Sequence, residues 1–217
     1  MKVAIAGGHG KIALLTTTLL RDSGHEVWGI TRNAAHGADI AEAGGQALVL
    51  DLEQSDSEQL AAELSSREID AVVFAAGAGP DSTAERKLTV DRDGAVLLAD
   101  AAFRAGVTRY VMVSAMSADD FDPESEEIFQ VYLRAKSEAD AALRETSLDW
   151  TIVRPGALTD DEAIGTVTLA RSTGRGEIPR ADVAAILAQL LVSGGAVHEQ
   201  FEAISGSTPI AEALGQL

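Results

Sequence analysis

The chain opens with a glycine-rich turn in the sequence Val3-Ala4-Ile5-Ala6-Gly7-Gly8-His9-Gly10-Lys11-Ile12-Ala13. The apolar run before the turn predicts a buried strand, and the residues from Lys11 onward predict a helix. Gly7 permits a tight turn, and Gly10 lets the backbone approach a pyrophosphate at the helix N-terminus. A glycine pattern alone also fits a plain turn. Its place between a strand and a helix favours a dinucleotide site.

Short β-rich runs alternate with helical stretches along the next 150 residues. Several of the runs are apolar throughout, as in strands that are covered on both faces. The alternation predicts an α/β fold with a doubly wound parallel sheet, the Rossmann fold. The predicted strands are Val3–Ala6, Val27–Thr31, Ala47–Leu50, Ala71–Ala75, Tyr110–Val113 and Trp150–Val153, and the predicted helices are Lys11–Ser23, Asp39–Ala43, Ser57–Ser65, Glu85–Ala105 and Glu124–Glu145.

The pattern becomes looser after Pro155. We expect one NAD(P)-binding domain over residues 1–217, with a core of residues 1–155 and a small C-terminal substrate lobe of residues 156–217. This lobe is either a lid over the binding crevice or a plain closing structure. Its predicted elements are a strand at Thr166–Leu169, a helix at Arg180–Val192, an apolar run at Gln200–Ile204 and a tail helix at Ile210–Leu214.

The composition excludes several classes of protein. The 217 residues include 17 basic and 34 acidic side chains, a net charge of −17, which argues against a nucleic-acid partner. There is no cysteine, so disulfides and thiolate metal sites are excluded. His25, His36 and His198 lack metal-ligand spacing and are interpreted as surface or structural residues, so we expect no metal. No window approaches the roughly 20 apolar residues of a membrane helix. We expect a cytoplasmic monomer or homodimer that acts on a small molecule and binds no membrane.

The end of the second predicted strand indicates which nucleotide is bound. NAD sites usually place an acidic residue about 20 residues beyond the glycines, to bind the ribose 2′-hydroxyl. Here the strand ends Gly29-Ile30-Thr31-Arg32-Asn33, without an acid. Arg32 can pair with a 2′-phosphate, although an ordinary exposed arginine is the alternative. NADP is therefore predicted in preference to NAD.

Three other strand ends would complete the crevice, because parallel strands end at the same edge of a sheet. Asp51 and Leu52 follow the third strand, where a carboxylate can accept from an adenine amino group. Small residues from Ala75 to Gly79 follow the fourth strand and leave room for the ribose and the nicotinamide. Ser114 follows the fifth.

Tyr132 and Lys136 lie four residues apart on one predicted helix face, whose start is indicated by Asp122 and Pro123. Carbonyl reduction needs a proton as well as a hydride, and a nearby ammonium would lower the pKa of a tyrosine toward neutrality. Ser114 would then orient the substrate oxygen. The alternative is that Tyr132 is only a half-buried aromatic residue on an amphipathic helix.

Taken in order, these motifs resemble those of atypical short-chain dehydrogenases/reductases. More narrowly, the chain is similar to their small NAD(P)-binding members, the flavin/biliverdin reductase and NAD-dependent epimerase/dehydratase-like group. The resemblance spans essentially the whole chain, and Asp149–Gly156 is its most specific segment. It departs from the usual T-G-x-x-G-x-x-G turn at Ala6 and Ala13, which weakens the subfamily assignment more than the assignment of nucleotide binding.

The resemblance assigns a role to each candidate residue. It implies that Ser114, Tyr132 and Lys136 match the catalytic trio of the family. It also implies a set of NADP-binding residues: Gly7, His9, Gly10, Lys11 and Ile12 at the pyrophosphate, Arg32 at the 2′-phosphate, Asp51 and Leu52 at the adenine, and Ala75, Ala76 and Gly77 at the ribose.

The function expected from these residues is NADP(H)-dependent hydride transfer to a small carbonyl, flavin or quinone-like acceptor. Two alternatives remain open. A non-catalytic NADP(H)-binding redox sensor would have no pocket above Tyr132 and Lys136, and would need an exposed apolar patch for a partner. A sugar-nucleotide epimerase or dehydratase would share the trio but needs more room than the segment after Pro155 offers.

Overall fold

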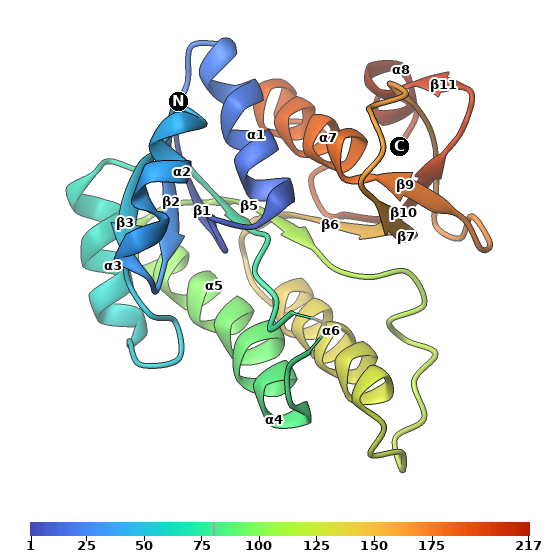
Figure 1. The fold of residues 1–217 in the computed structure, drawn as a ribbon, viewed down its shortest axis with the longest axis horizontal. Helices are drawn as coiled ribbons and strands as arrows, with labels where there is room; N and C mark the ends of the chain where they lie inside the picture. The colour runs from blue at the N-terminus through green and yellow to red at the C-terminus, as the bar shows by residue number, and fades with distance from the viewer. Residues whose placement is uncertain (80) are drawn as a thin grey trace.

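The computed structural model describes residues 1–79 and 81–217 and shows a mostly parallel sheet between two layers of helices (Figure 1). In chain order the elements are β1 (Lys2–Ala6), α1 (Lys11–Asp22), β2 (Glu26–Thr31), η1 (Ala34–His36), α2 (Gly37–Glu42), β3 (Gln46–Val49), α3 (Ser57–Ser66), β4 (Ala71–Phe74), α4 (Ala84–Arg86), η2 (Lys87–Asp93), α5 (Gly94–Ala105), β5 (Arg109–Val113), α6 (Ile128–Arg144), β6 (Asp149–Pro155), β7 (Ala157–Thr159), β8 (Thr166–Ala170), β9 (Glu177–Pro179), α7 (Arg180–Ser193), β10 (Glu199–Ser205), β11 (Thr208–Pro209) and α8 (Ile210–Leu214).

The large sheet of the described residues has nine strands in the order β11-β8-β10-β6-β5-β4-β1-β2-β3. The six strands from β3 to β6 are all parallel to their neighbours. The order 3-2-1-4-5-6 is that of a doubly wound dinucleotide-binding sheet. The predicted α/β fold is therefore confirmed.

The C-terminal segment extends this same sheet. β10 pairs in parallel with β6, and β8 and β11 continue the sheet with antiparallel pairing. β7 and β9 form a separate two-stranded parallel sheet beside it. The apolar run predicted at Gln200–Ile204 is thus a strand, β10, that lies between β6 and β8.

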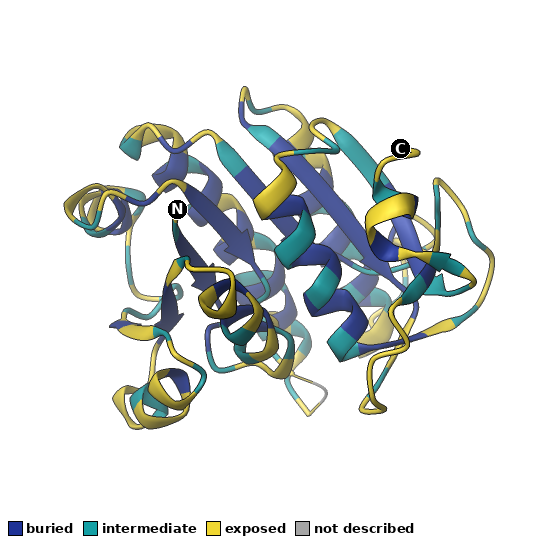
Figure 2. Ribbon diagram, turned by 90° about the horizontal axis from the view of Figure 1, so that it is seen from above, coloured by how far each residue is buried: buried dark blue, intermediate teal, exposed yellow. Residues whose placement is uncertain are grey.

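Two apolar clusters cover the two faces of the sheet. α1 and α7 pack on one face, where Leu20 and Ile186 are fully buried. α3, α5 and α6 pack on the other, with Leu64 and Leu98 in the core. Figure 2 shows the buried strands between helices whose outward surfaces are exposed. No helix within the described ranges is long and apolar enough to cross a membrane.

The predicted helix at Glu124–Glu145 begins later than its sequence signals indicated. α6 starts at Ile128, after Glu127, so Asp122 and Pro123 do not mark its start. The Asp122 carboxylate instead accepts from the Glu124 N–H at 3.0 Å and closes a local turn. An aspartate makes this turn as readily as it caps a helix, which explains the error.

The predicted helix at Glu85–Ala105 consists of three consecutive parts. One turn of α-helix (α4) leads into the π-helical segment η2, and α5 follows without a break. π-helical turns are rare and frequently occur at functional sites. Val90 and Asp91 are buried within this segment.

Candidate active site

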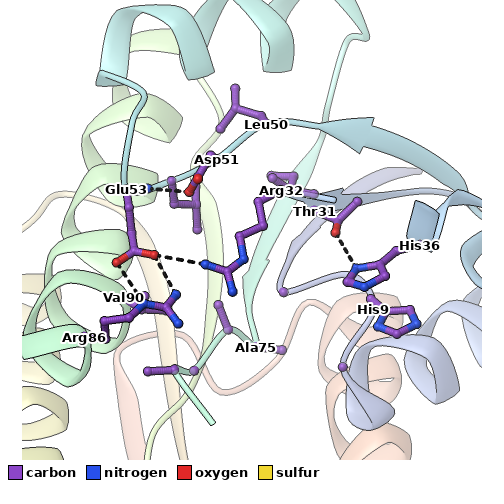
Figure 3. Close-up of a pocket in the computed structure, with 17 residues that line it drawn as sticks. His9, Thr31, Arg32, His36, Leu50, Asp51, Glu53, Ala75, Arg86 and Val90 are labelled. Carbon is purple, nitrogen blue, oxygen red and sulfur yellow. Dashed lines mark hydrogen bonds and ion pairs between the residues drawn. The ribbon is translucent and has the colours of Figure 1, made fainter. Parts of the chain in front are cut away.

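The carboxyl ends of β1 to β4 line a cavity of about 290 Å³, which we call the nucleotide cavity. Most of the predicted nucleotide-binding residues lie in its wall, and Figure 3 shows several of them around it. These are Gly7, His9, Gly10, Arg32, Asp51, Leu52, Ala75, Ala76 and Gly77. The structure therefore brings these residues together from four loops, and their contacts with a nucleotide remain predictions.

The glycine turn is held by two close approaches between backbones. Gly7 has a φ of +78°, and a Cβ there would lie 2.6 Å from the Cα of Ala76. A Cβ on Gly8 would lie 2.4 Å from the Cα of Gly29 in β2. The Gly8 N–H also donates to the Ile30 carbonyl at 2.9 Å. The contact of Gly8 with β2 was not predicted. The presence of glycine at both contacting positions, Gly8 and Gly29, is the feature of the sequence that could have indicated it.

The N-terminus of α1 faces this turn with its backbone donors free of a cap. Gly10 precedes the helix, and within residues 1–79 and 81–217 no side chain caps it. The first turn contains no acidic residue. The first N–H groups of a helix attract anions, so these donors fit the pyrophosphate of a dinucleotide.

Two predicted pyrophosphate residues lie elsewhere. Lys11 points to the C-terminal segment, where its Nζ donates to Asp160 at 2.5 Å. Arg180 binds the other oxygen of that carboxylate at 2.8 Å. Ile12 lines a second cavity instead. Neither residue is in the wall of the nucleotide cavity.

Arg32 shares a carboxylate with a second arginine in the nucleotide cavity (Figure 3). Its Nη1 lies 3.4 Å from Glu53 Oε2, which Arg86 binds at 2.6 Å. The hydrogen bond from Arg86 lowers the pKa of Glu53 below its ordinary value, with a further contribution from Thr89. Glu53 and Arg86 were not predicted. Arg32 is only weakly paired and is 55% exposed, so it remains available to an added phosphate.

The second cavity, which we call the acceptor cavity, has a volume of about 600 Å³. It shares Ala75, Ala76 and Gly77 with the nucleotide cavity, so the two cavities meet at the end of β4. The rest of its wall is mostly apolar and includes Ile12, Val113, Ile128, Phe129, Tyr132 and Leu158.

Tyr132 and Lys136 both line the acceptor cavity. The Lys136 Nζ lies 5.9 Å from the centre of the Tyr132 ring. Burial raises the pKa of Tyr132 by more than the charge of Lys136 lowers it, so this pKa lies above 10.0. The expectation that Lys136 brings the phenol toward neutrality is therefore wrong, because desolvation dominates.

Asp91 from η2 holds Lys136 in place. Its Oδ1 lies 3.3 Å from the Lys136 Nζ, which also donates to the Val113 carbonyl at 3.2 Å. Burial alone would lower the pKa of Lys136. The combined effect of Asp91, Tyr132 and Asp140 is larger, so the pKa of Lys136 is raised above its ordinary value. Asp91 Oδ2 accepts from the Ala78 N–H at 3.0 Å. Asp91 was not predicted as a site residue. The feature of the sequence that could have indicated it is an acidic residue on the apolar side of a helical segment.

Ser114 is buried and directs its hydroxyl away from the acceptor cavity. Its Oγ donates to Asp140 at 2.7 Å, and Arg154 binds Asp140 at 2.7 Å and Asp119 at 2.7 Å. Burial raises the pKa of Asp140, against the opposing effects of Arg154 and Ser114. Ser114 does not line either cavity, whereas Tyr132 and Lys136 do. The catalytic role of the trio stays a prediction.

The chain is similar to known proteins over its whole length. The NAD(P)H-binding family matches residues 7–193. The protein named "Uncharacterized sugar epimerase YhfK" of Bacillus subtilis is 36% identical, with 100% of both chains covered. A solved structure from Bacillus halodurans, named as an NAD-dependent epimerase/dehydratase, is also 36% identical and has a TM-score of 0.91 with full coverage of both chains.

A second solved structure is named as the oxidoreductase ylbE of Lactococcus lactis. It is 28% identical, has a TM-score of 0.84, and covers 100% of this chain and 96% of its own. The family match and the glycine turn at the end of β1 agree on the type of site. The chain therefore belongs to the NAD(P)H-binding family of Rossmann-fold proteins, whose cofactor is a nicotinamide dinucleotide.

Proposed function

We propose that the protein is an NADP(H)-dependent oxidoreductase of the atypical short-chain dehydrogenase type, which transfers hydride to a small carbonyl, flavin or quinone-like acceptor. The observation that carries this proposal is the acceptor cavity. It has room for a small organic molecule, joins the nucleotide cavity at Ala75–Gly77, and has Tyr132 and Lys136 in its wall.

The charges in the nucleotide cavity support the choice of NADP. Arg32 projects into it from the end of β2, where the chain has no acidic residue. Arg86 neutralises the nearby carboxylate of Glu53. With Glu53 paired to Arg86, Arg32 is the cation that a 2′-phosphate would meet at the end of β2, and Arg is suited to bind it with two hydrogen bonds.

The residues of the acceptor cavity supply the proton step of a carbonyl reduction. A nicotinamide held beside Ala75–Gly77 would supply the hydride that forms the new C–H bond as the carbonyl π bond breaks. The Tyr132 hydroxyl donates its proton to the resulting alkoxide oxygen, and its raised pKa keeps it protonated at neutral pH. The Lys136 ammonium, kept charged by Asp91, stabilises the phenolate that is left.

The apolar wall of the acceptor cavity favours a flat, weakly polar acceptor. Ile128 and Phe129 are 48% and 64% exposed at its edge, although both are large apolar side chains. Contact with a ligand would remove this surface from water. A flavin or quinone-like molecule satisfies this requirement without a dedicated polar partner for each of its atoms.

A sugar-nucleotide epimerase is the second candidate, favoured by the name of the Bacillus subtilis relative. Such a substrate carries a diphosphate, which needs cationic or backbone donors. Lys87 and Lys136 line the acceptor cavity, but Lys87 donates to the Gly79 carbonyl and Lys136 is paired with Asp91. The paired cations and apolar wall favour the reductase.

The test is a screen of aldehydes, ketones, quinones, flavins and sugar nucleotides with NADPH and NADH. Oxidation of NADPH by a carbonyl, quinone or flavin supports the proposal. Epimerisation of a sugar nucleotide without net oxidation would select the second candidate. Tight NADPH binding without turnover of any acceptor would favour a redox sensor.

We also propose that residues 1–217 form a single domain, with residues 156–217 as its substrate lobe. The pairing of β10 with β6 supports a single domain, because the strands of the substrate lobe continue the sheet of the core. Unfolding in urea should be one transition when followed by far-UV circular dichroism and by Trp28 and Trp150 fluorescence. Two separated transitions would contradict it.

A further inference from the structure

Two histidine rings are stacked at the side of the nucleotide cavity next to β2. His9 comes from the glycine turn and His36 from η1, and their centroids lie 3.7 Å apart with an angle of 11° between the planes. Both side chains and Arg32 belong to the cavity wall. Figure 3 shows Arg32 between this pair and the Glu53–Arg86 pair. His36, interpreted from the sequence as a surface or structural residue, therefore lies in the wall of the nucleotide cavity.

The hydrogen bonds of His36 match a neutral ring. Its Nδ1 lies 2.9 Å from Thr31 Oγ1, and its Nε2 lies 3.4 Å from the Asn33 Nδ2. The amide of Asn33 is oriented by its Oδ1, which accepts from the Ala35 N–H at 3.0 Å. A neutral ring donates from Nδ1 to Thr31 and accepts at Nε2. A protonated ring has a second N–H at Nε2, which the Asn33 NH₂ group cannot accept.

The charges around the stack leave a place for an anion. Asp39 from α2 binds the His9 Nε2 at 2.6 Å and offsets a charge on that ring. Arg32 follows β2, Asp51 and Glu53 follow β3, and Arg86 of α4 neutralises Glu53. Two cationic rings at the spacing of the stack repel each other, so charging both requires an anion beside them. A phosphate oxygen at His36 Nε2 would supply both the acceptor and the negative charge.

We propose that His36 is a specificity-determining contact for the 2′-phosphate of NADP(H), and that binding of this phosphate is accompanied by uptake of a proton by the stacked histidines. This inference rests on the proposed preference for NADP(H). Histidine is the side chain whose charge changes between about pH 5 and 8, so the discrimination against NAD(H) depends on pH in that range. A site built only from arginine would lack this dependence.

The direction of the pH effect separates this role from titration of the ligand. The second pKa of a phosphate monoester is about 6, so the 2′-phosphate loses charge in acid and would bind less tightly. Protonation of His36 acts in the opposite direction. The affinity of the protein for NADPH should therefore rise about tenfold from pH 8 to pH 6, the scale of one charged hydrogen bond. The affinity for NADH should stay constant.

The experiment is calorimetric titration of NADPH and NADH at pH 6 and pH 8, in buffers of different ionisation enthalpy. The wild type should take up about half a proton on average between pH 6 and pH 8 with NADPH, the amount that a tenfold change over two pH units requires, and none with NADH. His36→Gln should bind NADPH about tenfold more weakly than the wild type at pH 6 and almost equally at pH 8. His36→Arg should bind NADPH tightly at both pH values, because its charge does not change.

The matched control is His25→Gln, which changes a histidine beside the N-terminal end of β2, opposite the cavity. It should keep the wild-type pH dependence. Equal affinity of the wild type for NADPH and NADH would overturn the proposed cofactor preference together with the role of His36. A retained preference for NADPH, with the same pH dependence and proton uptake in His36→Gln, would overturn the role of His36 alone.

Discussion

The nucleotide cavity and the acceptor cavity meet at Ala75–Gly77 but use opposite kinds of chemistry. Charged side chains of the nucleotide cavity are partly exposed and share partners, as Arg32 and Arg86 share Glu53. In the acceptor cavity the charged pair Asp91–Lys136 is buried and is surrounded by apolar residues. The exposed ion pairs of the nucleotide cavity can therefore be replaced by contacts with a ligand at little cost in free energy. The buried pair of the acceptor cavity cannot, because breaking it would leave a charge buried without a partner.

The largest expected effect is on chemistry in the acceptor cavity. Tyr132→Phe should lower the rate of carbonyl reduction by about 10²–10⁴-fold, the usual contribution of a positioned general acid. NADPH affinity should change little, because Tyr132 lies outside the nucleotide cavity. Steady-state kinetics and a binding titration measure the two quantities. Full retention of ketone turnover would remove Tyr132 from the mechanism; retained flavin or quinone turnover alone would indicate a proton from solvent.

Removal of the buried carboxylate should mainly reduce stability. Asp91→Ala leaves the Lys136 ammonium buried without its partner, which should cost about 3–5 kcal/mol of unfolding free energy. Asp91→Asn keeps an acceptor for the Ala78 N–H and should cost less. Urea denaturation measures both. The control Asp93→Ala breaks an exposed pair with Arg92 and should cost at most about 1 kcal/mol. Equal losses for Asp91→Ala and Asp93→Ala would contradict the contrast between the cavities.

Reversal of the charge at Arg32 should alter cofactor choice without harming the fold. Arg32→Glu should lose about 1.5–3 kcal/mol of the preference for NADPH over NADH, the range for hydrogen bonds to charged groups. The side chain is exposed, so thermal stability should be nearly unchanged. Dissociation constants for both cofactors are the measurement. Arg104→Glu on α5 is the control and should leave the preference as it is.

The smallest expected effect is the pH dependence of stability that arises from Glu53. Its folded-state pKa lies below the ordinary value of 4.5, so it stabilises the fold above about pH 4.5. This contribution is lost as the pH falls through the folded-state pKa. Glu53→Gln should therefore cost about 0.5–1.5 kcal/mol at pH 7 and nothing in strong acid. Urea denaturation at both pH values tests this, with Glu42→Gln as the control. An equal loss of unfolding free energy at both pH values would indicate that Glu53 stabilises the fold by packing and not by its charge.

The fold was predictable because its signals are local. The buried strands are apolar runs, and the glycine turn lies between a strand and a helix, as the structure confirms. The start of α6 was not predictable from Asp122 and Pro123, because the same residues close a turn six residues earlier. Propensity does not distinguish these outcomes until the helix packs on the sheet.

The site was predictable where strand ends supply the residues, and not where packing pairs them. Arg32 and Ala75–Gly77 lie in the cavity wall because they directly follow strands. The pairing of Asp91 with Lys136 joins residues 45 positions apart and depends on how η2 packs against α6. Desolvation of Tyr132 is likewise a property of the packed structure, which is why the direction of its pKa shift was wrong.

The π-helical segment η2 sets the direction in which Asp91 faces. Each residue of an α-helix advances by 360°/3.6, or about 100°, around the axis, and a π-turn contains one residue more than an α-turn. Deletion of Arg92, which lies between Asp91 and α5, should rotate Asp91 by about 100° relative to α5. The carboxylate would then turn away from Lys136. Loss of a single residue from this segment should therefore be enough to break the buried pair of Asp91 with Lys136 beside Tyr132.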